Sequence, residues 1–347
     1  MAVRAVEIEL DELRRLIADP GTALPWGDDP SGVLVVDLDA VDLTGDDGPG
    51  PPHGLPAVVV GTSTCGAAAP AWCDLVIDPA AVDAVAATVD RNPVASSALV
   101  GLLRVADGSS VDAGLLAESS CYGVLQAGTE FREWRRSRPV RPVPGTERPV
   151  LVERRDDVLH LTLHRPERRN ALDAAMRDAL AEQLVLATVD PSIRRIVLDG
   201  AGPSFCSGGD LDEFGTYDDP AVAHLVRQER SLGRLLHSVA GRVEALIHGA
   251  CMGSGIELAA FAGHVRAGPD VSIGLPEVAM GLIPGAGGTV SLTRRVGRHR
   301  TCRLALTGER LDAATALEWG LVDEIVAPGA AAARDPGPSS ERFLTEP

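Results

Sequence analysis

The stretch Glu244–Thr289, EALIHGACMGSGIELAAFAGHVRAGPDVSIGLPEVAMGLIPGAGGT, carries two acidic residues beside glycine-rich breaks. A short apolar run leads through the Gly-Ser-Gly turn at 253–255 into a helical pattern with Glu257 in its first turn. The helix dipole favours a free carboxylate at that position. Twenty residues later, Glu277 follows Pro276 in a second helix-start pattern. Helix-start chemistry explains either acid alone, whereas the pair beside glycine turns indicates a site.

A second glycine turn, Phe205–Asp210 (FCSGGD), follows the strand pattern Ile196–Asp199. Backbone N–H groups at such turns are free, and two that point at one position can stabilise a developing oxyanion. We expect Gly209 and Ser254 to supply them. Ser254 and Glu257 are three residues apart and so lie on one helix face. This arrangement suits acid–base chemistry beside a polarised carbonyl.

Other chemistries fit the motifs less well. Ser254 is not in a GxSxG elbow, because Met252 and Ile256 occupy the flanking glycine positions. His248 is expected to bond to the backbone at a strand end. The glycines of Gly285–Thr289 lack the lysine of a phosphate loop and the dinucleotide-binding spacing. We expect them to let a helix pack close to a neighbouring backbone.

Composition indicates a globular protein of 347 residues, with 45% hydrophobic and 23% charged residues. The net charge of -17 argues against nucleic-acid partners and anionic membrane surfaces, although local arginines can still hold an anionic ligand. The six cysteines show no metal-ligand spacing, so buried reduced thiols are expected. No signal-peptide core and no run of about 18 apolar residues is present, which predicts a cytoplasmic protein without a membrane partner.

The sequence divides at a proline-rich segment, 139–149, which we interpret as a linker. In 1–138 it predicts a helix, three strands and three helices, at Leu10–Ala18, Val33–Asp37, Ala57–Val60, Leu75–Asp78, Val82–Asp90, Val94–Val105 and Val111–Trp134. In 150–326 it predicts a hairpin followed by alternating helices and strands, at Val150–Leu163, Asn170–Asp190, Ile196–Asp199, Ala221–Val239, Ala245–Ile247 and Ser254–Phe261. Residues 327–347 read as a disordered tail.

Five motifs in order make Pro149–Val326 resemble the enoyl-CoA hydratase/isomerase (crotonase) superfamily. They are HRPERRNAL (His164–Leu172), FCSGGDL (Phe205–Leu211), HGACMGSGIELA (His248–Ala259), LPEVAMGLIPGAGGT (Leu275–Thr289) and LTGERLDAATALEWGLVDEIV (Leu306–Val326). The resemblance implies an α/β fold, the ClpP/crotonase-like spiral of ββα units with a helical trimerisation region, assembled as a homotrimer or hexamer. It also implies an acyl-CoA thioester substrate and no separate cofactor or metal.

The resemblance further implies roles for individual residues. The N–H groups of Gly209 and Ser254 would form the oxyanion hole, Glu257 would activate water for attack at C3, and Glu277 would exchange the proton at C2. CoA contacts would fall on Arg168, Arg169, Ala171, Ser207 and Asp210. Together these imply a lyase that adds water across the 2,3-double bond of an acyl-CoA. An isomerase or acyl-CoA hydrolase of the same superfamily, or a non-catalytic acyl-CoA-binding subunit, remain alternatives.

The sequence departs from the family pattern in two ways. Ser254 replaces the middle glycine of a GGG triplet and His248 replaces an asparagine, which puts the substrate's identity in question. Family members also continue past the GLVDEIV motif with helices that cap the site, whereas here Val82–Pro139 resembles that part. We hypothesise that residues 1–138 supply these helices, as a permuted or duplicated copy; the alternative is an unrelated helical domain.

Overall fold

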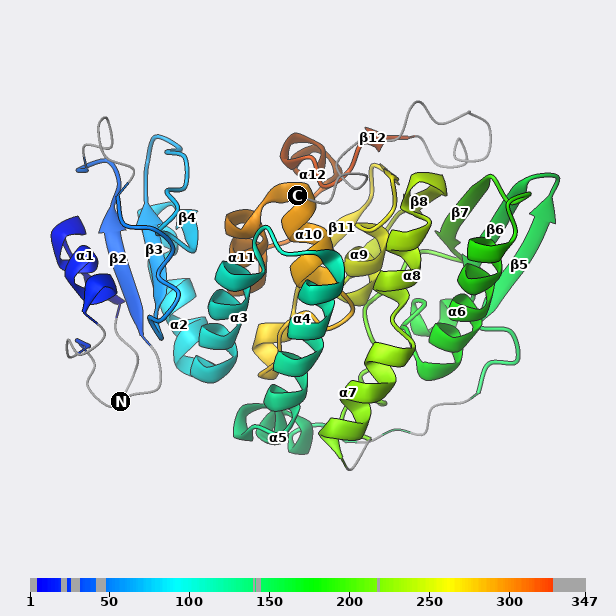
Figure 1. The fold of residues 1–347 in the computed structure, drawn as a ribbon, viewed down its shortest axis with the longest axis horizontal. Coiled ribbons are helices and arrows are strands. Elements are labelled where there is room, and N and C mark those ends of the chain that lie inside the picture. The colour runs from blue at the N-terminus through cyan, green and yellow to red at the C-terminus, as the bar shows by residue number, and fades with distance from the viewer. Residues whose placement is uncertain are drawn as a thin grey trace.

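The computed structural model describes residues 5–19, 24–25, 32–41, 48–139, 141, 145–216 and 219–326. Two sheets lie at opposite ends of the molecule with helices between them (Figure 1). The strands are β1 (Ala5–Glu7), β2 (Val33–Asp37), β3 (Val58–Thr62), β4 (Leu75–Ile77), β5 (Val150–Arg155), β6 (Val158–Leu163), β7 (Arg195–Gly200), β8 (Val243–Ile247), β9 (Ala250–Met252), β10 (His264–Ala267), β11 (Ser272–Gly274) and β12 (Glu324–Ile325). The helices are α1 (Leu10–Ala18), α2 (Val82–Arg91), α3 (Pro93–Ala106), α4 (Val111–Gln126), α5 (Thr129–Arg136), α6 (Ala174–Val189), α7 (Pro220–Glu229), α8 (Leu232–Ser238), α9 (Ser254–Ala259), α10 (Gly288–Val296), α11 (Arg298–Thr307) and α12 (Ala313–Trp319).

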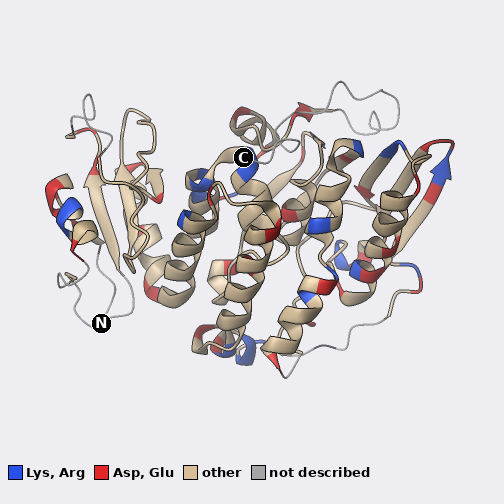
Figure 2. Cartoon of the chain, viewed as in Figure 1, with Lys and Arg blue, Asp and Glu red and all other residues tan. Residues whose placement is uncertain are grey.

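The first sheet has the order β1-β2-β3-β4, and all of its strand pairs are parallel. Its strands β2 and β3 are buried and carry almost no charge (Figure 2), as expected for a parallel sheet covered on both faces. Helix α1 packs Leu13 and Leu16 on one face. On the other face, buried Arg104 of α3 donates two hydrogen bonds to Asp74, of 2.8 and 2.5 Å, which tie the sheet to the helical layer.

The second sheet has the order β12-β10-β8-β7-β6-β5. The β5–β6 pair is the predicted hairpin, and the remaining pairs are parallel. Strands β9 and β11 form a small parallel sheet beside it. Because the crossover helices return the chain to the same sheet edge, the ends of β7 and β8 place the two predicted glycine turns near each other.

Three predicted helices are wrong in their extent. The segment 111–134 is two helices, α4 and α5, because the chain turns at Gly128, whose N–H donates to Leu125. The segment 221–239 is also two helices, and Ser231 caps the second of them. Helix α6 begins only at Ala174, where the Asp173 side chain accepts the N–H of Met176 and so fixes the start.

Helices α2 to α5 pack on the helices of the second half of the chain. Helix α4 lies beside α7 and α10, while α2 and α3 contact α11 (Figure 1). The permuted or duplicated origin of this segment stays a prediction. The predicted tail 327–347 and parts of the linker lie outside the described residues. No described helix is long and apolar enough to span a bilayer. The six cysteines are free, but Cys65 is exposed, so the prediction of buried thiols is wrong for that residue.

Candidate active site

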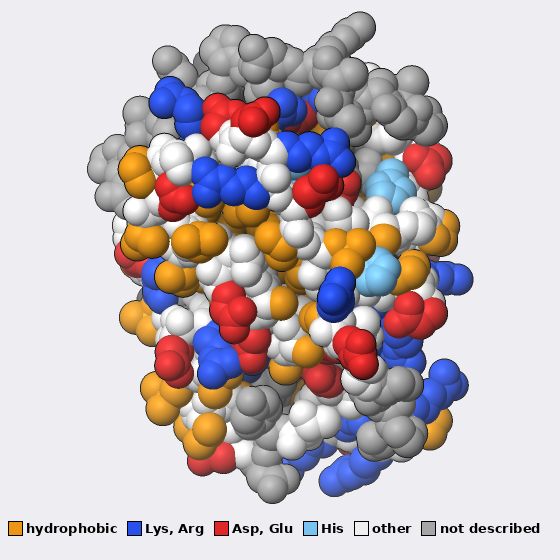
Figure 3. Space-filling model, turned by 90° about the vertical axis from the view of Figure 1, so that its right-hand side faces the viewer, with side chains coloured by type: hydrophobic (Ala, Val, Ile, Leu, Met, Phe, Trp, Pro, Cys, Tyr) orange, Lys and Arg blue, Asp and Glu red, His pale blue; other side chains and the backbone are white. Residues whose placement is uncertain are grey.

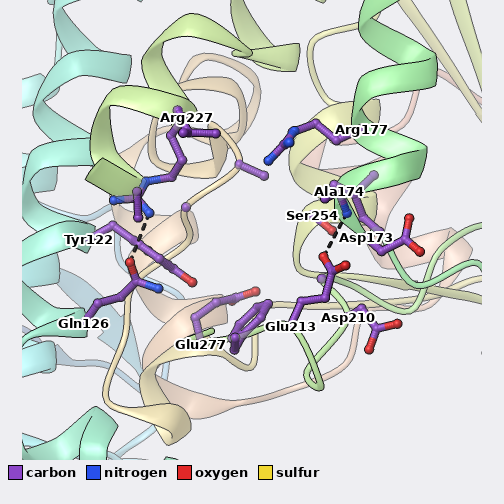
Figure 4. Close-up of a pocket in the computed structure, with 18 of the residues that line it drawn as sticks. Tyr122, Gln126, Asp173, Ala174, Arg177, Asp210, Glu213, Arg227, Ser254 and Glu277 are labelled. Atoms are coloured by element: carbon purple, nitrogen blue, oxygen red, sulfur yellow. Dashed lines mark hydrogen bonds between the residues drawn. The ribbon is translucent and has the colours of Figure 1, made fainter. Parts of the chain in front are cut away.

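Both predicted acids and both predicted oxyanion donors line a cavity of about 210 Å³. Figure 4 shows Ser254 and Glu277 among the residues that line it. Its walls come from α4, α6, α7, the loop after β7, the start of α9 and the turn before α10. The lining residues are Tyr122, Gln126, Leu172, Asp173, Ala174, Arg177, Gly209, Asp210, Glu213, Phe214, Gly215, Ala223, Val226, Arg227, Ser254, Glu257, Glu277, Gly285 and Ala286. Segments more than 160 residues apart in sequence therefore meet at one point.

A short backbone pairing joins the two glycine turns. Cys206 pairs in parallel with Cys251: its N–H donates to Ala250 over 3.1 Å, and its carbonyl accepts the N–H of Met252 over 2.9 Å. This pairing holds the loop after β7 against β9 just before α9 begins. It brings together the two turns whose convergence the sequence argument assumed.

The N–H groups of Gly209 and Ser254 are both available. Gly209 pairs with Leu172 through bonds made by its neighbours, because Leu172 donates to Gly208 and Asp210 donates to Leu172, each over 2.9 Å. Ser254 is the first residue of α9, so its N–H has no partner within the helix. Neither N–H has a bond to another described residue, which leaves two donors at the cavity wall.

Glu257 is held by the turn that precedes α10. Its Oε2 accepts the N–H groups of Ala286 and Gly288 over 2.7 and 2.9 Å. A Cβ at Gly288 would lie 2.5 Å from Cγ of Glu257. The glycines of this turn are therefore required by nearby side chains, and the prediction that they admit a neighbouring backbone is wrong.

Glu277 opens a short 3-10 turn, Glu277–Met280, and its side chain is also buried. Its Oε2 has no hydrogen-bond partner among the described residues. Gly253 adopts φ +47°, and a Cβ there would lie 2.3 Å from Oε1 of Glu277. The first glycine of the Gly-Ser-Gly turn thus makes room for the second acid.

Burial is the main cause of the raised pKa values of both acids. It raises the pKa of Glu277 from 4.5 to about 8. Burial also raises the pKa of Glu257 well above its usual value, with further contributions from the charges of Glu277 and Glu118. At Glu257 desolvation and the neighbouring carboxylates oppose the ionised form, whereas the helix dipole and the two N–H groups from Ala286 and Gly288 favour it. The charge of Glu118 contributes to the raised pKa of both acids, so the protonation of the three buried carboxyl groups is linked.

A third buried acid, Glu118 of α4, was missed in the sequence. Its Oε1 accepts the N–H of Gly287 over 2.7 Å, and its Oε2 accepts the N–H and hydroxyl of Thr289 over 2.9 and 2.6 Å. Burial raises the pKa of Glu118 to about 7. Its signal was position: it lies three residues after Leu115 and four before Tyr122, on the predicted buried face of a helix.

The five predicted CoA contacts, namely Arg168, Arg169, Ala171, Ser207 and Asp210, line a second cavity of about 580 Å³. It shares Gly209 and Asp210 with the first cavity. Arg168 is already ion-paired with Asp210 and Asp212, over 2.9 and 2.6 Å. Arg138 and Arg141 also line this cavity and were missed. The basic run 132–138 was interpreted as a solvated helix end, and Arg141 lies in the segment interpreted as a linker.

His248 lies outside the first cavity, and its Nε2 is 3.0 Å from the carbonyl of Gly202. The prediction that it bonds to the backbone is confirmed. The first cavity therefore draws its acid–base groups from carboxylates.

The fold and the cavity define an α/β protein in which buried acids and unpaired backbone donors face one space. Residues 153–332 match the family described as Enoyl-CoA hydratase/isomerase. The chain is 37% identical over 176 residues to a 2,3-dehydroadipyl-CoA hydratase of Escherichia coli, covering 51% of this chain and 68% of that protein. It is 36% identical to a probable enoyl-CoA hydratase of Rhizobium meliloti, covering 52% and 69%.

A crystal structure of an enoyl-CoA hydratase/carnithine racemase from Magnetospirillum magneticum has the same fold, with a TM-score of 0.50 and 27% identity over 54% of this chain and 72% of that one. The chain belongs to the enoyl-CoA hydratase/isomerase family, and its fold is that of the crotonases.

Proposed function

We propose that the protein adds water across the 2,3-double bond of an acyl-CoA thioester. The observation that carries this proposal is one cavity lined by Glu257, Glu277, Gly209 and Ser254. The names of the two curated relatives, both hydratases, support it. The proposed reaction requires no separate cofactor or metal, because the acids and backbone donors supply the proton transfer and charge stabilisation.

In the proposed mechanism the thioester oxygen accepts the N–H groups of Gly209 and Ser254. Water attacks C3 and gives a proton to the Glu257 carboxylate, while the Glu277 carboxylic acid gives its proton to C2. The two N–H bonds to Glu257 favour its ionised form, whereas Glu277 has an oxygen without a partner. These bonds favour a negative charge on Glu257 and a proton on Glu277. Proton exchange with solvent then resets the pair.

The CoA part of the substrate is proposed to occupy the second cavity. Its arginines, including Arg138 just before the linker and Arg141 within it, provide positive charge for phosphate groups in a chain of net charge -17. The shared residues Gly209 and Asp210 connect this cavity with the acids. That the five predicted CoA contacts line this one cavity supports the proposal.

Assembly as a homotrimer or hexamer and a cytoplasmic location are part of the proposal. Exposed apolar side chains on β5 and α6 support assembly: Leu151, Val152, Val185, Leu186 and Val189. Figure 3 shows apolar side chains scattered among the charges on that side of the molecule. Light scattering coupled to size exclusion tests the oligomeric state.

The test of function is loss of the 2-enoyl chromophore with crotonyl-CoA and longer enoyl-CoAs. We expect turnover in the wild type, and losses of several orders of magnitude in Glu257→Gln and Glu277→Gln. Glu182→Gln, on the exposed face of α6, is the matched control. Turnover that survives Glu257→Gln alone would indicate isomerase chemistry. Thioester binding without any turnover would indicate a binding protein.

A further inference from the structure

Two arginines enter the proposed acyl cavity from facing helices. Arg177 of α6 and Arg227 of α7 line both the first cavity and an adjoining one of about 140 Å³. The close-up view shows the two side chains on opposite sides of the cavity, above Glu277 (Figure 4). The walls between them include Leu172, while Leu232 and Leu258 line the adjoining cavity. An apolar chain that runs away from Glu257 and Glu277 would meet both cations.

Arg227 is half-buried, and its partners differ from those of the fully buried arginines in the described chain. Those arginines each lie within 4.0 Å of a carboxylate; they are Arg104, Arg165, Arg266, Arg295 and Arg298. Arg227 instead donates to the Ser119 hydroxyl, the Ser119 carbonyl and Gln126, and it covers the Tyr122 ring at 4.8 Å. No described carboxylate lies within 4.0 Å of it. Burying part of a guanidinium removes some of its hydration, and an anion placed beside it would offset that loss.

The neighbouring charges leave this position open to an anion. Burial lowers the pKa of Arg227, so its charged form lacks some of the stabilisation that water gives. The closest buried acid of α4, Glu118, is already committed to three donors of the turn before α10. Arg177 has one carboxylate partner, Asp178, and Arg230 bonds to the same carboxylate. Asp178 is thus divided between two guanidinium groups.

We infer that the acyl chain of the substrate ends in a carboxylate, which Arg227 binds together with Arg177. The substrate class is then the mono-CoA thioester of a 2-enedioic acid, with its methylenes against the leucines and its free carboxylate at the guanidinium groups. A guanidinium bonds a carboxylate through charge-assisted hydrogen bonds. This inference rests on the proposed hydration, and it adds a substrate class and a specificity site.

The test compares pairs of enoyl-CoAs of equal length, one ending in a carboxylate and one in a methyl group, from five to eight carbons. We expect the wild type to prefer the carboxylate of at least one pair by about tenfold to a hundredfold in kcat/KM, as charge-assisted hydrogen bonds allow. Arg227→Gln and Arg177→Gln should each reduce this preference about tenfold or more while turnover of the methyl-ended partner changes less. Arg155→Gln, an exposed arginine on β5, controls for net charge.

The ratio of kcat/KM for the two members of a pair distinguishes a loss of specificity from a folding defect, because a folding defect slows both members alike. Arg227→Lys keeps the charge and should retain part of the preference. Equal turnover of both members by the wild type would overturn the inference and leave the proposed hydration standing. If neither member is hydrated, the proposed function fails. Calorimetry with the corresponding saturated acyl-CoAs, one ending in a carboxylate and one in a methyl group, still tests whether the arginines bind the carboxylate. Equal affinities for that pair would overturn it.

Discussion

Removal of Glu118 tests whether the N-terminal half of the chain holds the catalytic turn. The N–H groups of residues 286 to 289 alternate between two buried acids, since Ala286 and Gly288 donate to Glu257 while Gly287 and Thr289 donate to Glu118. In Glu118→Ala two buried N–H groups lose their acceptor. At about 1–3 kcal/mol for each unsatisfied group, we expect a loss of about 2–6 kcal/mol in the free energy of unfolding.

The same variant should lower the rate. The turn that loses its bonds to Glu118 also positions Glu257, so kcat for an enoyl-CoA should fall about tenfold or more, as for other small displacements of catalytic groups. Urea denaturation and the chromophore assay measure the two effects. Asp112→Asn removes an exposed carboxylate from the same helix and should change the free energy of unfolding by less than about 1 kcal/mol.

The conservative variant Glu118→Gln distinguishes the bonds from the charge. Burial raises the pKa of Glu118 from 4.5 to about 7, so between these pH values the folded chain holds a proton that the unfolded chain has lost. The stability from this group is fully present below about pH 4.5 and is lost as pH rises to about 7. Glutamine resembles the protonated acid, so Glu118→Gln should match the wild type at low pH and gain stability relative to it at pH 8. A Glu118→Ala variant with wild-type stability and rate would refute this account.

Three further predictions follow from single contacts. The pKa of Glu277 is also raised, to about 8, so the free energy of unfolding of the wild type should decrease between about pH 4.5 and 8. Glu277→Gln should flatten this decrease, and an unchanged slope would contradict the raised pKa. Gly253→Ala forces a Cβ to 2.3 Å from Glu277 at φ +47°, and should abolish turnover even if circular dichroism shows a folded chain; full activity would be incompatible with this packing. Asp74→Ala leaves the buried Arg104 without its carboxylate, so the free energy of unfolding, measured by thermal or urea denaturation, should fall by about 3–5 kcal/mol. A fall of less than about 1 kcal/mol would mean that water reaches the guanidinium.

Local patterns were sufficient to predict the glycine turns and both acids. Each of these features is specified by residues adjacent in sequence, such as the Gly-Ser-Gly turn before Glu257 and the Pro276 before Glu277. The strand and helix positions in 1–138 were also largely predicted, because apolar runs and helical spacing are local. The extents of α4 and α7 were not, because the local turn at Gly128 and the capping role of Ser231 were not recognised in the sequence.

Long-range contacts determined what the sequence argument missed. In the sequence Glu118 is one more glutamate in a predicted helix. Its role as acceptor for the turn before α10 is visible only in the structure, where α4 lies against α10. Arg227 lies within the predicted helix 221–239 and was not singled out, because the absence of a described carboxylate near it depends on the elements packed around it. Arg138 was interpreted as part of a solvated, charged helix end, whereas in the structure it lines the second cavity. Residue type and spacing cannot specify such partners.

The site cannot be assigned to the family-matched segment alone. That segment spans 153–332, yet the first cavity is also lined by Tyr122 and Gln126, and Glu118 holds the turn next to Glu257. Each acid satisfies two of the four N–H groups of residues 286 to 289, so neither half of the chain satisfies the turn by itself. Since an unsatisfied buried N–H costs about 1–3 kcal/mol, the two halves should stabilise each other and unfold together. The helices on the N-terminal side of the linker are therefore part of the catalytic unit, whatever their origin.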